Sequence, residues 1–217
     1  GKELAKQTGW DILSRSVDGV DLTDITTWAH LLLPYDTIIN CIAYTNTYDN
    51  NKEKHWNVNY KAVANLVDYC NEENIKLIHI STDYVYTNSI SNASENDIPI
   101  HGNNWYSYTK LLADAYIQLK SKNYLICRGT HKANPFPYEK AWINQIGNFD
   151  YVNIIAYLII KLINSNNCGI FNIGTELKSM FDLAIKSKNK VIAELKPQYV
   201  PENLTMDISK LKNLMNE

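Results

Sequence analysis

Tyr106 and Lys110 stand four residues apart in WYSYTKLLAD (105–114), a stretch with the apolar pattern of an amphipathic helix. Residues with this spacing lie on one face of a helix. A tyrosine has a pKa near ~10, too high for proton transfer at neutral pH, and a nearby ammonium group lowers that pKa by favouring the phenolate. The pair therefore predicts a tyrosine that exchanges protons, although the same spacing is also common on ordinary helix surfaces.

A second polar group, Ser81-Thr82-Asp83, closes an apolar run that begins at residue 75 and is typical of a buried strand. Alone, such residues can simply turn or cap the chain. A polar loop then leads to Tyr106, so the fold can bring the Thr82 and Tyr106 hydroxyl groups together. That arrangement suits a carbonyl being reduced or an alcohol being oxidised, with the hydride supplied by a cofactor.

Alternating strands and helices would position these residues. Strands are predicted at 10–14, 36–43, 75–81, 124–128, 169–174 and 189–195, and helices at 1–8, 24–32, 56–73, 107–120, 152–164 and 207–216. This alternation predicts an α/β fold with a doubly wound parallel sheet. Ligands bind at the carboxyl edge of such sheets, so we expect a site built from residues 41–49, 81–104 and 128–150.

Composition narrows the class of protein. The chain has 217 residues, 45% hydrophobic and 20% charged, as in an ordinary globular protein. A net charge of −2 gives no electrostatic reason to expect nucleic acid or an anionic membrane as a partner. No apolar run approaches the ~18 residues of a membrane span, and no signal peptide is visible.

The cysteines show no metal-binding pattern. Cys41, Cys70, Cys127 and Cys168 are scattered without a CxxC pair, which argues against a zinc site. Buried thiols in a reducing compartment explain them better, and we expect a cytoplasmic protein.

Five stretches occur in an order that carries a family resemblance: STDYVY (81–86), YSYTK (106–110), LICRG (125–129), FDYVNIIAYLI (149–159) and GIFNIGT (169–175). This ordered set resembles the extended short-chain dehydrogenase/reductase superfamily, and within it the dTDP-4-dehydrorhamnose reductases and related nucleotide-sugar 4-ketoreductases. The resemblance implies a Rossmann-like dinucleotide-binding domain at 1–129. It also implies a mixed substrate-binding region at 130–217 that partly completes the sheet.

The resemblance assigns catalytic roles. Tyr106 would protonate the sugar carbonyl oxygen, and Lys110 would tune Tyr106 and hold the nicotinamide ribose. Thr82 would orient the carbonyl, and Asp83 would bind sugar hydroxyls or assist proton transfer. The residues expected to contact the substrate are Thr82, Asp83, Tyr84, Tyr106 and Thr130.

The resemblance also assigns a cofactor site. The segment at the end of the 36–43 strand would run along the cofactor, and an asparagine of the 56–73 helix would support the active site. The implied cofactor-binding residues are Gly1, Ser14, Arg15, Asp21, Leu22, Ile42, Ala43, Tyr44, Thr45, Asn59, Ser81, Tyr106, Lys110 and Arg128.

The choice between NADP(H) and NAD(H) depends on the end of the strand expected at 10–14. Folds that prefer NAD usually place an acid there for the ribose 2′-hydroxyl, but this chain has Ser14 and Arg15. Arginine binds phosphate through two parallel hydrogen bonds, which favours NADP(H). Arg15 can instead stack on adenine or face solvent, so NAD(H) stays open.

Two features depart from the family pattern. The glycine-rich loop GxxGxxG is not in the sequence, and Gly1 reads as its last glycine, so we expect the first strand and most of the loop to precede Gly1. The region after Arg128 lacks the family's tryptophan and has His131, which can contact a substrate phosphate or lie on the surface.

The sequence thus predicts NAD(P)H-dependent reduction of a 4-keto-6-deoxy nucleotide sugar in deoxysugar or polysaccharide biosynthesis. Asp83 is followed by Tyr84 rather than glutamate, which disfavours a dehydratase. Two alternatives remain: a nucleotide-sugar 4-epimerase, and a non-catalytic dinucleotide sensor of the same fold. The apolar stripe of helix 56–73 can pack on the sheet or on a second subunit, which leaves a homodimer open.

Overall fold

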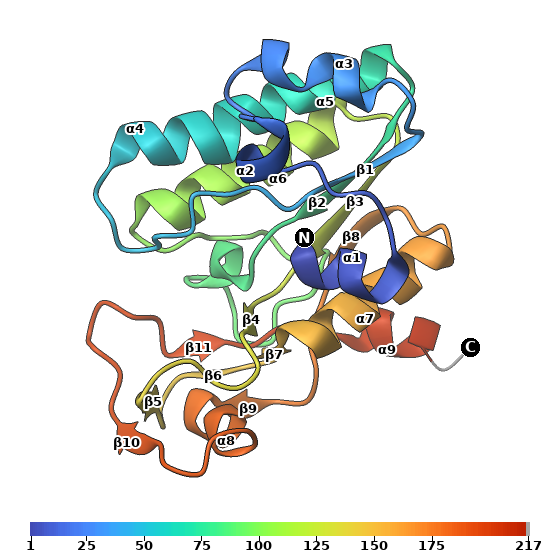
Figure 1. The fold of residues 1–217 in the computed structure, drawn as a ribbon. Helices are drawn as coiled ribbons and strands as arrows, with labels where there is room; N and C mark the ends of the chain where they lie inside the picture. The colour runs from blue at the N-terminus through green and yellow to red at the C-terminus, as the bar shows by residue number, and fades with distance from the viewer. Residues whose placement is uncertain (216–217) are drawn as a thin grey trace. The chain divides into compact units, whose positions relative to one another are not determined.

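The computed structural model describes residues 1–215 and divides the chain into two compact units (Figure 1). Unit 1 contains residues 1–81, 103–127 and 167–170, and unit 2 contains the remainder. The division differs from the predicted domains, because residues 82–102 belong to unit 2 and residues 167–170 to unit 1. The cofactor and substrate roles given to the two predicted domains stay predictions.

Unit 1 is built around a sheet with the strand order β1-β2-β3-β8. The strands are β1 (Thr37–Asn40), β2 (Lys76–Ile80), β3 (Tyr124–Arg128) and β8 (Gly169–Asn172), whose last residues group with unit 2. Strand β2 pairs in parallel with both β1 and β3, and Ile78 lies opposite Ile39 and Leu125. The predicted α/β class is confirmed by these parallel, helix-connected strands.

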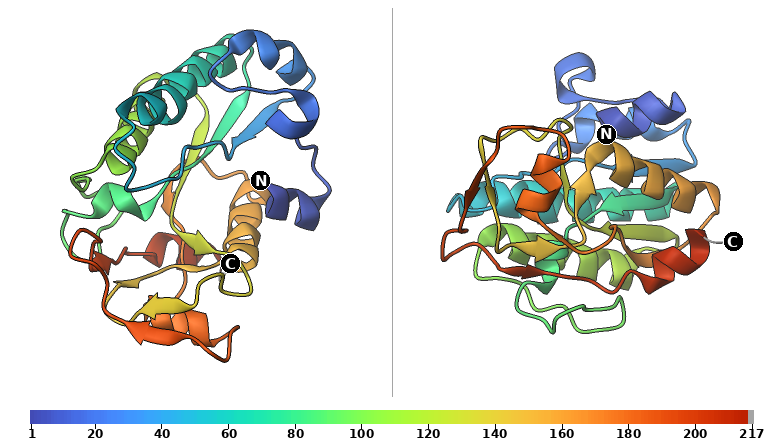
Figure 2. Two further views of the ribbon diagram at one scale, coloured as in Figure 1. Left: turned by 60° about the vertical axis from the view of Figure 1, so that its left-hand side comes forward. Right: turned by 90° about the horizontal axis from the view of Figure 1, so that it is seen from below.

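Helices cover one face of this sheet, where α4, η2 and α5 follow one another end to end (residues 52–72) and α6 (Trp105–Lys120) lies beside them (Figures 1 and 2). The apolar stripe of the predicted 56–73 helix packs into the unit 1 core with Leu77 and Ile126 of the sheet, which is the first of the two predicted alternatives. The helices of unit 1 are α1 (Lys2–Thr8), α2 (Arg15–Asp18), η1 (Ile25–Thr27), α3 (Ala29–Leu32), α4 (Lys52–Lys54), η2 (His55–Lys61), α5 (Ala62–Glu72) and α6 (Trp105–Lys120).

The prediction of a strand at 10–14 is wrong, since these described residues form no strand. Ser14 instead caps α2: its hydroxyl accepts from the Val17 amide, and its own amide donates to the Asp18 carboxylate. Such local side-chain bonds compete with sheet pairing. Ile12 is also 47% exposed, so the segment buries little apolar surface.

Unit 2 contains short strands around a second core made by Phe136, Phe149, Tyr151, Met180 and Leu183. Its strand pairs are β4 with β7, β5 with β10, and β6 with both β9 and β11. The elements are η3 (Asp83–Tyr86), β4 (His131–Lys132), β5 (Lys140–Trp142), β6 (Ile146–Gly147), β7 (Asp150–Tyr151), α7 (Val152–Asn164), β9 (Lys178–Ser179), α8 (Met180–Ile185), β10 (Ile192–Glu194), β11 (Asn203–Leu204) and α9 (Ser209–Met215).

Most of the long loop predicted at 87–104, up to residue 102, belongs to unit 2 and is held there by hydrogen bonds. The Ala93 carbonyl accepts from the Asn172 side chain at 3.0 Å and from the Asp207 amide at 2.9 Å. The Asn92 amide donates to the Thr205 hydroxyl at 2.7 Å. Segments far apart in sequence thus hold the loop in place, since a loop this long needs partners beyond its neighbours.

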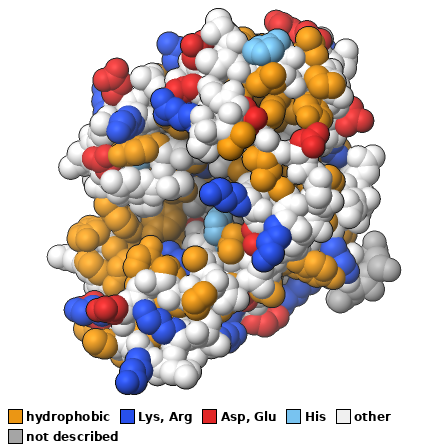
Figure 3. Space-filling model, in the orientation of Figure 1, with side chains coloured by type: hydrophobic (Ala, Val, Ile, Leu, Met, Phe, Trp, Pro, Cys, Tyr) orange, Lys and Arg blue, Asp and Glu red, His pale blue; other side chains and the backbone are white. Residues whose placement is uncertain are grey.

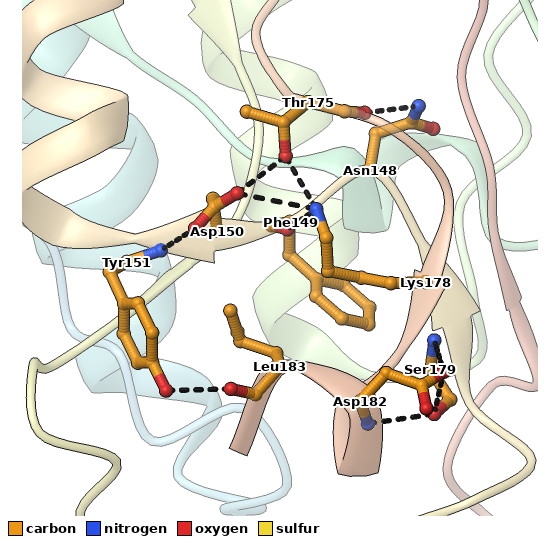
Figure 4. Close-up of polar contacts among 9 residues, drawn as sticks. All are labelled: Asn148, Phe149, Asp150, Tyr151, Thr175, Lys178, Ser179, Asp182 and Leu183. Carbon is orange, nitrogen blue, oxygen red and sulfur yellow. Dashed lines mark hydrogen bonds and ion pairs between the residues drawn. The ribbon is translucent and has the colours of Figure 1, made fainter. Parts of the chain in front are cut away.

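A part-buried polar network lies in unit 2 around Lys178 (Figure 4). Lys178 Nζ donates to the Thr175 hydroxyl and the Phe149 carbonyl, and it pairs with the Asp150 carboxylate at 3.2 Å. Thr175 also donates to that carboxylate at 2.6 Å. The network joins β7, β9 and the segment that follows β8.

The surface shows charges of both signs interspersed on the face drawn in Figure 3. Among residues 1–215, no helix combines the length and apolar character that a membrane crossing requires.

Candidate active site

Helix α6 positions the predicted pair Tyr106 and Lys110. The Asn104 side chain caps the helix by accepting from the Ser107 amide at 2.8 Å, so Tyr106 lies in the first turn. Lys110 is 1% exposed and reaches the end of β2, where Nζ donates to the Ile80 carbonyl at 2.8 Å. Burial lowers the pKa of Lys110 to about 8, against the opposing influence of Asp114 and Cys41. Lys110 can therefore change its charge close to neutral pH.

Asn59 holds the segment that follows β1. Its amide oxygen accepts from the Tyr44 backbone amide at 2.7 Å, and its amide nitrogen donates to the Tyr44 carbonyl at 3.1 Å. Asn59 lies in η2, which is a π-helix, an uncommon form that often occurs at functional sites. Asn59 thus clamps the backbone of one residue, Tyr44, while its supporting role in an active site stays a prediction.

His55 joins this clamp to the start of α6. Its ring lies 4.8 Å from the Tyr44 ring and 6.3 Å from the Tyr106 ring, between centroids. Unit 1 therefore brings together Tyr106, Tyr44 and Asn59. Ile42 and Thr45, on the same segment as Tyr44, are exposed, and Ala43 is half-buried.

Thr82, Asp83 and Thr130 form a separate group in unit 2. The Thr130 hydroxyl donates to Asp83 Oδ1 at 2.6 Å and the Thr82 hydroxyl donates to it at 3.2 Å. Burial raises the pKa of Asp83 to about 6, although both hydrogen bonds and Lys132 act in the opposite direction. Within the described residues the buried Asp83 Oδ2 has no hydrogen-bond partner. Tyr84, half-buried, donates its amide to Thr82.

Arg128 ends β3 as a buried cation. Its Nη1 donates to the Tyr86 hydroxyl at 2.5 Å, and its guanidinium carbon lies 5.0 Å from the centre of the Tyr86 ring. The next residue, Gly129, passes so close to Ile173 that a Cβ would lie 2.4 Å from its carbonyl oxygen. Only glycine fits there, so this backbone path is fixed.

The residues expected at the adenosine end of the cofactor differ in exposure: some reach the surface and one lies in the core. Arg15 pairs with Asp21 at 2.9 Å between Nη2 and Oδ2, and its side chain is 81% exposed. Leu22 is instead buried in the unit 1 core, and its carbonyl accepts from the Trp28 indole. Two further residues were predicted to bind the cofactor elsewhere, and of these Gly1 lies directly before α1. Ser81 is buried at the end of β2.

Sequence reasoning missed two buried residues behind Lys110. His79 Nε2 lies 2.9 Å from Lys110 Nζ, and His79 Nδ1 lies 3.2 Å from Asn40 Nδ2. The only signal in the sequence was a polar residue within each of two apolar strand runs, TIIN and KLIHI.

A family model described as the RmlD substrate binding domain matches residues 1–131. The chain belongs to this family. The sequence-based prediction of the family is thereby confirmed. The matched range includes Thr82, Asp83, Tyr106, Lys110 and Thr130.

Two curated relatives show what the chain is similar to. One is the probable low-salt glycan biosynthesis reductase Agl14 of Haloferax volcanii, 33% identical over 116 residues, which is 50% of this chain and 38% of that protein. The other is the dTDP-4-dehydrorhamnose reductase of Mycobacterium tuberculosis, 31% identical over 91 residues, 41% of this chain and 30% of that protein. The matched stretches span less than half the length of either relative.

A solved structure shows the same fold. The dTDP-4-dehydrorhamnose reductase from Bacillus anthracis, in complex with NADP, superposes with a TM-score of 0.82. The match has 21% identity and covers 98% of this chain and 87% of that chain. The Rossmann-like α/β fold of this RmlD-family chain is therefore established.

Proposed function

We propose that this protein is an NADP(H)-dependent reductase of a 4-keto-6-deoxy nucleotide sugar, acting in deoxysugar or polysaccharide biosynthesis. The observation that carries the proposal is the buried amine of Lys110 at the end of β2, one helical turn from Tyr106, in a chain of the RmlD family. The names of both curated relatives support it, since each is a reductase.

The chain's own residues divide the chemistry. NADPH, when bound, supplies the hydride. Tyr106 donates a proton to the sugar carbonyl oxygen, and the ammonium form of Lys110 favours the phenolate that this leaves. Thr82 orients the sugar carbonyl once its hydroxyl turns away from Asp83 Oδ1, to which it donates at 3.2 Å in the structure. Asp83 accepts hydrogen bonds from sugar hydroxyls through Oδ2, the oxygen without a partner in the described residues.

The residues at the expected cofactor site fit NADP, whose ribose carries a 2′-phosphate. Arg15 exposes a guanidinium group on a short helix capped by Ser14, and such a group binds a 2′-phosphate well. The segment 42–45, which Asn59 holds at Tyr44, would lie along the cofactor. Asp21 already pairs with Arg15, so this carboxylate would orient the guanidinium rather than bind the ribose. NADP bound to the Bacillus anthracis reductase supports the same choice.

The remaining parts of the proposal concern organisation. Residues 1–129 would bind the cofactor and residues 130–217 the nucleotide sugar. All four cysteines carry thiols, and Cys70 and Cys127 are buried, which supports a reducing, cytoplasmic location. A homodimer is retained as an expectation from the sequence alone.

The test is to mix the protein with NADPH and dTDP-, UDP- or GDP-linked 4-keto-6-deoxy sugars and to follow NADPH absorbance. We expect one nucleotide sugar to be reduced, and Tyr106→Phe to lower kcat by about 100-fold or more while NADPH affinity is kept. Tyr108→Phe, two residues away on the same helix, is the matched control. Turnover without added NADPH would show an epimerase, and NADPH binding without any turnover would show a sensor.

A further inference from the structure

His79 and Asn40 lie behind Lys110 and belong to neighbouring parallel strands. The register of β1 and β2 places Asn40 directly opposite His79. His79 is completely buried, Asn40 is 4% exposed and Lys110 is 1% exposed. Three polar side chains are thus buried next to one another. Each hydrogen bond among them needs a donor on one side and an acceptor on the other.

The orientation of the Asn40 amide is fixed by the backbone. The Ile42 amide donates to Asn40 Oδ1 at 2.9 Å, so this oxygen is the acceptor and Nδ2 points to His79 Nδ1. An amide nitrogen only donates hydrogen bonds. His79 Nδ1 must therefore accept.

The position of the His79 proton follows. Burial lowers the pKa of His79 well below its usual value, so the ring is neutral and carries one proton. Because Nδ1 accepts, this proton lies on Nε2, which faces Lys110 Nζ at 2.9 Å. A lysine can accept a proton donor only as a neutral amine, since an ammonium group has no lone pair.

As a neutral amine, Lys110 can make both of its hydrogen bonds to strand β2. It accepts from His79 Nε2 and donates to the Ile80 carbonyl at 2.8 Å. The ammonium form would require Nε2 to accept, which moves the ring proton to Nδ1, against the Asn40 amide. In the ammonium form of Lys110, the N–H at His79 Nδ1 and the N–H of the Asn40 amide would thus face each other as two buried donors with no acceptor between them.

We propose that Asn40 and His79 are positioning residues that disfavour the ammonium form of Lys110 and so let this lysine exchange a proton near neutral pH. Other titratable groups of unit 1 act on Lys110 in the opposite sense: Asp114 on the same helix and Cys41 after β1. The consequence for catalysis rests on the proposed function, because the charge on Lys110 acts on Tyr106.

His55 in the same unit gives an internal comparison. Asn59 Nδ2 faces His55 Nδ1 at 3.3 Å, and the Tyr44 amide fixes the Asn59 oxygen as an acceptor. His55 Nε2 lies 3.1 Å from the Asp49 carbonyl, which only accepts. His55 must carry its proton on Nε2 for the same reason as His79, but no lysine is involved.

The first test is the tautomer of His79 in the intact chain, read from nitrogen NMR of ¹⁵N-histidine-labelled protein. We expect His79 and His55 both to show a protonated Nε2 and a bare Nδ1 at pH 10, where Lys110, with a pKa of about 8, is the neutral amine. His79 is assigned by loss of its signals in His79→Gln, or by elimination with substitutions at the other four histidines. An Nδ1-protonated or doubly protonated His79 at this pH overturns the proposal, and assignment by elimination needs no folded variant of His79.

The second test is the titration of Lys110, followed by NMR of labelled lysine. Asn40→Asp places an acceptor at Nδ1 and His79→Gln an amide oxygen near Nζ, so both stabilise the ammonium form. We expect each to raise the pKa of Lys110 by about one pH unit, a tenfold change in the ratio of its two forms. His30→Gln, the same substitution at an exposed histidine, controls for His79→Gln and leaves the titration unchanged.

A Lys110 titration that does not move in either variant overturns the proposal. If the protein also reduces a nucleotide sugar, the pH at which kcat changes should move with Lys110. Absence of any reductase activity would refute the proposed function alone, because the tautomer and the titration are measured without substrate.

Discussion

At the scale of single residues, burial decides which side chains can change charge. Lys110 and Asp83 are both about 1% exposed, and burial moves the pKa of each toward neutrality, to about 8 and about 6. Sequence motifs identified both residues but said nothing about their surroundings. An acid or base poised near neutral pH is what proton transfer requires.

Asp83 gives a prediction about stability and pH. Its pKa is about 6 in the folded protein, against an ordinary value of 3.8. Between these values the folded state binds more protons than the unfolded state, so stability falls as pH rises from about 4 to about 6. We expect the free energy of unfolding of the wild type, relative to Asp83→Asn, to fall by about 3 kcal/mol across this range.

Denaturant unfolding at a series of pH values measures this difference. Thr130→Val provides a second arm, because it removes a hydrogen bond that lowers the pKa of Asp83. It should extend the fall in stability to higher pH. A stability difference between wild type and Asp83→Asn that does not vary with pH would contradict the prediction.

At the scale of elements, helix α6 depends on its first turn to carry Tyr106. The Asn104 side chain accepts from the Ser107 amide and also from the Ser107 hydroxyl at 3.0 Å. Such caps satisfy amide groups that have no partner within the helix.

Asn104→Ala should therefore lower the free energy of unfolding by about 1 kcal/mol, measured by denaturant unfolding. Asn104→Asp keeps the cap and should stay close to wild type. Under the proposed function, Asn104→Ala should also reduce kcat, since fraying displaces Tyr106. Equal stability of the alanine and aspartate variants would show that the cap contributes nothing.

At the scale of the whole molecule, each unit has its own core and its own buried polar groups. Unit 2 combines very short strands with the network around Lys178, whose side chain is 8% exposed, while that of its partner Asp150 is 14% exposed. Removing one member of a buried pair leaves the other charge without compensation.

We expect Lys178→Met to lower the free energy of unfolding by about 3 kcal/mol. Lys140→Met is the matched control, because Lys140 pairs with Glu194 at 2.7 Å but both side chains are largely exposed. Surface pairs contribute about 1 kcal/mol or less. Thermal and denaturant unfolding of both variants would compare them, and equal losses would show that burial of the Lys178 pair is unimportant.

The sequence by itself determined most of the alternation of strands and helices, the family, and the spacing that places Tyr106 and Lys110 one turn apart on the same helix. These depend on local periodicity and fixed spacing, which a linear chain displays. It misjudged residues 10–14, because apolar residues alone do not show that Ser14 and Asp18 satisfy the backbone locally.

Only the tertiary structure decided what surrounds the reactive groups. Asn40 and His79 are 39 residues apart, and only the register of β1 and β2 brings them together behind Lys110. The direction of each hydrogen bond there depends on a backbone amide, that of Ile42. Burial and hydrogen-bond direction belong to the folded chain, so the charge state of Lys110 follows from the fold rather than from the motif.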